Sequence, residues 1–134
     1  MTGLVLKLAP KERVLINGAV IENGDRRSRI CIMTPNANVL RLKDAIHPDD
    51  AVTPVRRLCY TVQLVLTGDR SSDQAKPGAI LRMEELSRVF TDPDSRDLLR
   101  RASQALIEDN FYACLKSLRA LLPREERLLA VAAR

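Results

Sequence analysis

The spacing of hydrophobic positions changes along the chain. Over residues 4–43 apolar and polar side chains largely alternate, whereas after residue 53 apolar side chains recur every three or four positions. The first spacing is typical of half-buried strands and the second of amphipathic helices. The sequence therefore predicts an α+β fold, in which an N-terminal antiparallel β meander is followed by C-terminal α-helices.

The first half contains four or five short strands separated by tight turns. Residues 4–8 alternate with a period of two, and Asn17-Gly18 separates two β-rich runs. Asn-Gly is a strong hairpin signal because a type I′ turn needs positive φ at both central residues. Further turns are predicted at residues 23–25 and 34–36. Because a small sheet has exposed edges, we expect either a homodimer or the chain's own helices to cover them.

The second half is predicted to be helical. Thr53-Pro54 is a helix start, with a capping hydroxyl followed by a proline in the first turn. The β-branched run at 59–66 leaves a strand open for the end of that helix. Helices are then expected over about 78–90, after 93 and after 111, with Pro123 opening a last short one. The predicted organisation is a β-rich basic region with the first helix at 1–66, a polar linker at 67–77 and a helical region at 78–134.

Charge adds information to this picture. The 134 residues carry 22 basic and 17 acidic side chains, a net charge of +5. Residues 1–66 hold ten basic and six acidic groups, so most of the excess lies there and favours a polyanionic partner. No apolar run approaches about 18 residues, which argues against a membrane partner. Without a secretory pattern at the start, and with three cysteines in no paired spacing, we expect a cytoplasmic protein.

The sequence offers little for catalysis. His47 is the only histidine, the cysteines lack metal-ligand spacing, and no phosphate-binding glycine loop or nucleophile motif is present. Adjacent acidic pairs such as Glu84-Glu85 point about 100° apart on a helix, so they form no matched acid and base. We expect no enzyme, no catalytic residue, no metal and no cofactor.

Basic side chains in the first half form three clusters. A charge run is usually a solvated face, but Arg forks also suit phosphates and base edges. No aromatic residue occurs in the strand region, so RNA contacts there would use charge and hydrogen bonds instead of base stacking. The candidate RNA-binding residues are Arg26, Arg27, Arg29, Arg41, Lys43, Arg56 and Arg57.

Several of these residues also carry a family resemblance. The chain resembles the FlbT family of alphaproteobacterial flagellar regulators in these segments: Asn17-Gly18-Ala19-Val20, Asn23-Gly24-Asp25-Arg26-Arg27, Leu40-Arg41 with Lys43-Asp44, and Thr53-Pro54-Val55-Arg56-Arg57. The resemblance implies a post-transcriptional regulator that binds the 5′ untranslated region of flagellin mRNA and represses its translation or promotes its decay. It also implies a companion protein, FlaF. In some members the same protein promotes flagellin expression.

Two further interpretations remain open. The strand order around Arg29–Ile32 and Thr34-Pro35 is similar in architecture to the carbon storage regulator, a small mRNA-binding β-strand dimer. In this sequence both Arg41 and Lys43 are candidates for the position of that protein's RNA-contacting arginine. Alternatively, the chain is a flagellar adaptor or chaperone. The leucine faces after Gly78 would then bind flagellin or FlaF, although leucines at helical spacing are more often core.

Overall fold

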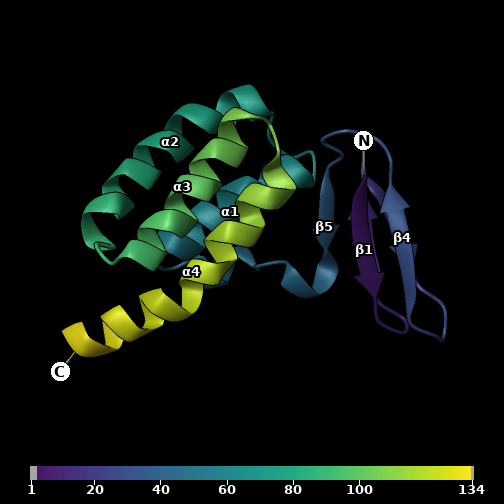
Figure 1. The fold of residues 1–134 in the computed structure, drawn as a ribbon, viewed down its shortest axis with the longest axis horizontal. Coiled ribbons are helices and arrows are strands. Elements are labelled where there is room, and N and C mark those ends of the chain that lie inside the picture. The colour runs from purple at the N-terminus through teal and green to yellow at the C-terminus, as the bar shows by residue number, and fades with distance from the viewer. Residues whose placement is uncertain (1–2, 134) are drawn as a thin grey trace.

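The predicted fold class is confirmed: antiparallel strands occupy the N-terminal part of the chain and helices the rest. The computed structural model describes residues 3–133. In Figure 1 the helices lie together on one side and the strands on the other. The elements are β1 (Leu4–Leu8), β2 (Arg13–Ile16), β3 (Ala19–Glu22), β4 (Ser28–Ile32), β5 (Val39–Arg41), the 3-10 turns η1 (Leu42–Asp44) and η2 (Pro48–Asp50), α1 (Pro54–Leu66), α2 (Ser72–Val89), α3 (Pro93–Ile107) and α4 (Phe111–Ala132).

The strands form two antiparallel sheets. One contains β1 and β4, and the other has the order β3-β2-β5. The β2–β3 hairpin turns at Asn17 and Gly18, whose φ values are +47° and +86°, as the Asn-Gly signal predicts. The β1–β4 and β2–β5 pairings differ from the predicted meander, in which each strand pairs with the next one along the chain. The reason is that residues 9–12, directly after β1, carry the chain from one sheet to the other.

The buried residues form two cores, and β5 contributes to both. A small core of Leu6, Leu8, Val14 and Val39 lies between the two sheets. The next residue, Leu40, belongs to the large helical core instead. Because consecutive strand residues point to opposite faces, β5 joins the sheets to the helices. In Figure 1, β5 is the labelled strand nearest to the helices, and β4 is the farthest from them.

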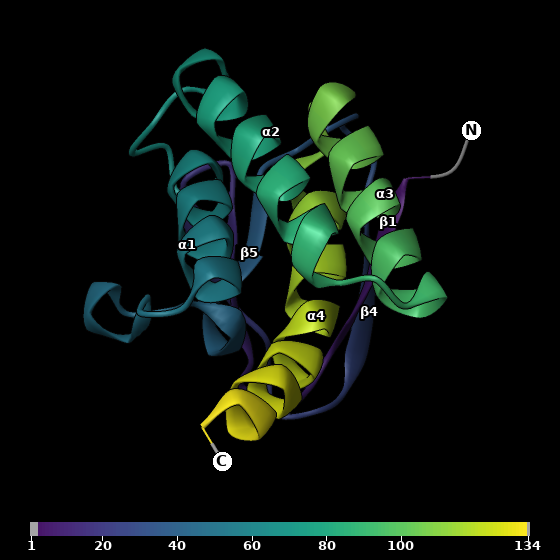
Figure 2. The same ribbon diagram turned by 90° about the vertical axis from the view of Figure 1, so that its left-hand side faces the viewer.

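Helix α1 begins where the capping signal predicts. The Thr53 hydroxyl accepts a hydrogen bond from the Arg56 N–H, and Pro54 occupies the first turn. The run at 59–66 is helical, because its apolar positions complete the buried face begun by Val55 and Leu58. The side chain of Gln63, also buried, binds both the N–H (2.7 Å) and the carbonyl (3.0 Å) of Ile46. Figure 2 shows the four helices from the side opposite the sheets.

Two helix boundaries correct the sequence prediction. Helix α2 begins at Ser72, so the connection after α1 is only residues 67–71 instead of 67–77. A reciprocal capping box between Ser71 and Gln74 starts this helix within the polar stretch. Pro123 does not open a new helix but lies inside α4. Two residues after Pro123, Glu125 accepts hydrogen bonds from the start of α1 and anchors the second half of α4. Within residues 3–133 no helix combines the length and the apolar character that crossing a membrane requires.

Candidate nucleic-acid interface

The outer face of the β1–β4 sheet carries a pair of like charges. Leu6 and Leu8 of β1 point into the core between the sheets, so the intervening Lys7 points outward. Lys7 lies directly opposite Arg29 of β4 in the antiparallel register. Like charges in directly opposed positions destabilise a sheet unless something of opposite charge lies near them. Neither side chain forms an ion pair within the part of the chain that the structure describes. This arrangement favours an anionic ligand.

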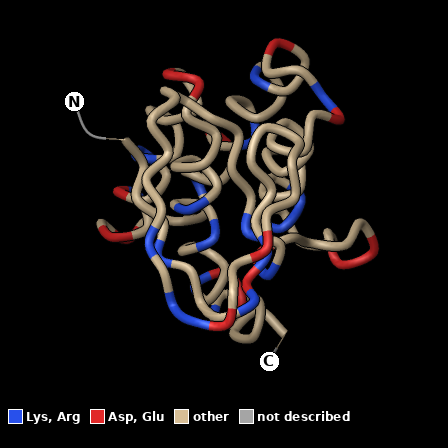
Figure 3. Tube along the Cα trace, turned by 90° about the vertical axis from the view of Figure 1, so that its right-hand side faces the viewer, with Lys and Arg blue, Asp and Glu red and all other residues tan. Residues whose placement is uncertain are grey.

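An open depression of about 510 Å³ lies beside this pair. Its basic side chains come from the β1–β4 sheet, from the β3–β4 connection and from η1, directly after β5: Lys7, Arg27, Arg29 and Lys43. The structure therefore brings together three of the residues singled out from the sequence, Arg27, Arg29 and Lys43. Figure 3 views the molecule from the sheet side and shows Lys and Arg along the strands and their turns.

Arg41 is engaged inside the protein. Its Nη1 lies 2.9 Å from Glu12 Oε2 and donates to the Lys7 carbonyl at 3.1 Å. The Glu12 side chain is only 6% exposed and accepts a further hydrogen bond from the Ala9 N–H. Burial alone raises the pKa of Glu12, but this N–H and Arg41 outweigh burial and hold the pKa below its ordinary value. Arg41 thus joins β5 to β1 and positions Lys7. Among the residues that the structure describes, Glu12 is the one acidic residue that lines the depression.

The remaining predicted residues lie outside this depression. Arg26 is exposed in the β3–β4 connection, where its carbonyl accepts a hydrogen bond from the Asn23 side chain. Arg56 lies 3.6 Å from Glu126 of α4, and Arg57 donates to the Val52 carbonyl at 3.3 Å. Both belong to the first turn of α1 and line none of the depressions around the strands.

The structure adds basic residues that the sequence reasoning missed. Lys7 is one of them, and the alternation of residues 4–8 was the signal in the sequence that could have placed it on the outer face. Lys116 and Arg119 of α4 line a neighbouring depression of about 360 Å³ together with Arg41 and Lys43. Arg119 is held there by Asp44, to which its Nη1 donates at the carbonyl (3.0 Å). Helical spacing alone does not say which face of α4 adjoins β5, so these two had no signal in the sequence.

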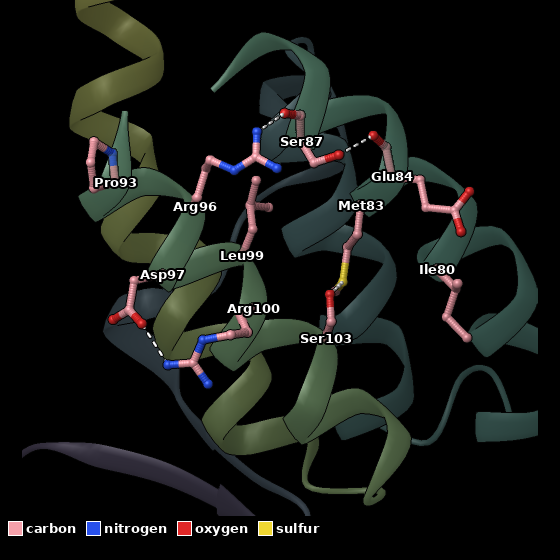
Figure 4. A pocket seen from close by; sticks show the side chains of 10 residues that line it. All are labelled: Ile80, Met83, Glu84, Ser87, Pro93, Arg96, Asp97, Leu99, Arg100 and Ser103. Carbon is pink, nitrogen blue, oxygen red and sulfur yellow. Dashed lines mark hydrogen bonds and ion pairs between the residues drawn. The ribbon is translucent and has the colours of Figure 1, made fainter. Parts of the chain in front are cut away.

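A second candidate site lies between α2 and α3. It is an open groove of about 600 Å³. Figure 4 shows its lining side chains, among them Ile80, Met83 and Leu99. The Ser103 hydroxyl contacts Met83 Sδ at 3.2 Å, and Arg96 reaches across to the Ser87 carbonyl at 3.3 Å. The prediction that the leucine face of α3 is core is confirmed for Leu99, Ala102 and Leu106, which are buried. The groove is thus a shallow surface above a packed interior.

The reactive side chains are dispersed. Among residues 3–133, no group of three or more His, Cys, Asp or Glu side chains is placed to hold a metal ion. His47 is exposed and caps η2 by accepting from the Asp49 N–H. Burial raises the pKa values of the Cys59 and Cys114 thiols to about 12, whereas Cys31 is exposed on β4. The two buried thiols therefore stay protonated at neutral pH.

Comparisons with known proteins identify the family. Residues 4–129 match the model of the family described as flagellar protein FlbT. The chain is similar to three proteins, each named as a probable flagellum biosynthesis repressor protein FlbT. The one from Rhodopseudomonas palustris is 34% identical over 95% of this chain and 98% of that relative. The one from Mesorhizobium japonicum is 33% identical (94% and 84%), and the one from Caulobacter sp. strain K31 is 29% identical (93% and 95%). No solved structure gives a significant match. The resemblance inferred from the sequence is thereby confirmed, and the chain belongs to the FlbT family of flagellar proteins.

Proposed function

We propose that this chain is a post-transcriptional regulator of flagellin expression, and that it binds the 5′ untranslated region of flagellin mRNA with the outer face of its β1–β4 sheet. Binding there represses translation of the message or promotes its decay. The family supports the regulatory part of this proposal, since the relatives are named as repressors of flagellum biosynthesis. The directly opposed Lys7 and Arg29 are the observation that supports RNA as the ligand.

The chemistry of this face fits a flexible single strand. Lys7, Arg27, Arg29 and Lys43 supply positive charge from three parts of the chain, so a bent phosphate backbone can contact several of them. The aromatic residue Tyr112 packs against the core between the sheets, and no aromatic side chain of the described residues lines the depression beside Lys7 and Arg29. Stacking of bases on aromatic rings is therefore not the mode that this face favours. Affinity would come from phosphate neutralisation and hydrogen bonds.

The test uses the double variant Lys7→Ala/Arg29→Ala. Removing the like-charge pair should leave folding stability unchanged or slightly higher. Affinity for the flagellin leader should fall about tenfold or more, because two phosphate contacts are lost. The matched control is Arg82→Ala/Arg88→Ala, which removes two exposed arginines from α2. Equal affinities of the two double variants would contradict the proposal.

A second candidate function uses the groove between α2 and α3. Its lining combines Ile80, Met83 and Leu99 with charged groups of both signs, which suits an amphipathic helix of a protein such as flagellin or FlaF. Ile80 is 39% exposed, so Ile80→Lys should keep the fold while placing a charge in the groove. Loss of FlaF or flagellin binding in pull-down experiments, with leader RNA binding retained, would favour this adaptor function.

A further inference from the structure

One side of the β lobe, defined as β1–β5, is open. The β3 edge facing away from β2 and the β4 edge facing away from β1 pair with no strand in the described part of the chain. The β1 and β5 edges are not open in the same way, because Arg41 of β5 donates to the Lys7 carbonyl of β1 and links the two strands. Unpaired edges present N–H and C=O groups to any strand that fits them.

Side chains that belong to the core of this lobe are uncovered on the same side. Ile21 pairs with Val14, and Ile30 pairs with Leu6, so both isoleucines share a face with residues buried between the sheets. Ile21 nevertheless remains 40% exposed, and Ile30 and Ile32 are only half-buried. In the described part of the chain, four buried residues between a two-stranded and a three-stranded sheet make a small core, and the two-stranded β1–β4 sheet is marginal by itself. The lobe therefore lacks a neighbouring strand beside β3 and beside β4.

We propose that a second copy of this chain supplies it, in a two-fold dimer in which β3 of each copy pairs antiparallel with β4 of the other. The two edges match in length, four and five residues. Placing Ile21 opposite Ile30 keeps both on the inner face, because directly opposed residues point the same way. The same register places Val20 opposite Cys31, and Glu22 opposite Arg29.

This register has two favourable consequences. Glu22, which already binds Arg13 of its own chain at 2.9 Å, then lies opposite Arg29, so this cross-strand position carries opposite charges. The Arg29 guanidinium keeps further donors for a phosphate, and Lys7, Arg27 and Lys43 are not involved in the pairing. Each β1–β4 sheet is continued by the partner's β3-β2-β5 sheet. Two five-stranded sheets with apolar inner faces then stack on each other. The contact is isologous, since each copy gives one β3 and one β4 edge, and both open edges are closed at once.

The first test is the mass in solution. Light scattering at micromolar concentration should give twice the 15.0 kDa of the chain for the wild type. Ile21→Lys places an inward-pointing charge at the pairing edge and should give a folded monomer. Ile80→Lys, at a site of nearly equal exposure on α2, is the matched control and should remain dimeric. A monomeric wild type would overturn the proposal, as would an Ile21→Lys variant that is folded and still dimeric.

The second test reads the register and covers the case in which Ile21→Lys does not fold. Under mild oxidation, Val20→Cys should form a disulfide with Cys31 of the other copy, which gives a covalent dimer on a non-reducing gel. Val20→Cys combined with Cys31→Ser should give no such band. A disulfide within one chain would instead show β3 paired with its own β4. That result, or the absence of any bond to Cys31, would overturn the pairing between copies.

Discussion

Glu125 joins the last helix to the start of the first, and its removal should destabilise the protein strongly. Its carboxylate is 6% exposed and accepts hydrogen bonds from the Thr53 hydroxyl and, at 2.8 Å, from the Val55 N–H. The Val55 N–H is one of the donors that the first turn of a helix leaves without an internal partner. The carboxylate also carries the charge that a helix N-terminus favours.

The cost of Glu125→Ala follows from these contacts. Val55 is fully buried, so its N–H would lose its partner without gaining free access to water. An unsatisfied buried donor costs about 1–3 kcal/mol, and the lost bond from Thr53 adds about 1 kcal/mol. We therefore expect the free energy of unfolding to fall by about 2–4 kcal/mol.

Urea denaturation followed by circular dichroism measures this loss as a shift in the midpoint at constant slope. The neighbouring Glu126 provides the control: its side chain is 72% exposed and lies 3.6 Å from Arg56. Exposed ion pairs contribute about 0–1 kcal/mol, so Glu126→Ala should change stability little. If the two variants unfold at the same urea concentration, Glu125 does not cap α1 and the argument fails.

Three other predictions concern the β lobe and the cysteines. At pH 8 an aromatic disulfide reagent should modify Cys31 rapidly and Cys59 and Cys114 only after urea is added; three fast thiols in the folded protein would show that the core is open. Gly18→Ala should cost about 1 kcal/mol because Gly18 has φ +86°, whereas Gly24→Ala, at a position without positive φ and with open space around it, should be nearly neutral in the same unfolding assay. Because the folded-state pKa of Glu12 is lowered, its contribution to stability is present above the ordinary pKa of 4.5 and is lost as the pH falls through the lowered value. Glu12→Gln should therefore lose less stability than the wild type between pH 7 and pH 3; unfolding curves with equal losses would argue against the Glu12–Arg41 contact.

The sequence predicted the elements more successfully than their arrangement. The Asn17-Gly18 turn and the Thr53-Pro54 helix start depend on local backbone chemistry, so they were readable from a few residues. The start of α2 was also encoded locally, in the Ser71 and Gln74 capping box, but Pro77 and the polar composition pointed to a linker. Pro123 was misread because the contact that holds α4 beyond it comes from α1, about 70 residues away.

The candidate site shows the same division. Arg27, Arg29 and Lys43 were selected because they are basic and lie in the strand region, and they do line one depression. The sequence did not reveal that Arg41 faces Glu12, a residue 29 positions away, or that Lys7 faces Arg29. These relations depend on which strands pair, and β1 pairs with the fourth strand instead of the second.

The salt dependence of leader RNA binding tests the proposed function most directly. Each phosphate of a single-stranded RNA that the protein neutralises makes the slope of log K against log salt steeper by about 0.7. Four contacts, from Lys7, Arg27, Arg29 and Lys43, predict a slope near −3 and a roughly 50-fold loss of affinity between about 50 and 200 mM salt. Filter binding should show a slope shallower by about 1.4 for Lys7→Ala/Arg29→Ala and an unchanged slope for Arg82→Ala/Arg88→Ala. A wild-type affinity that does not change with salt, or equal slopes for all three proteins, would contradict RNA binding by the β1–β4 face.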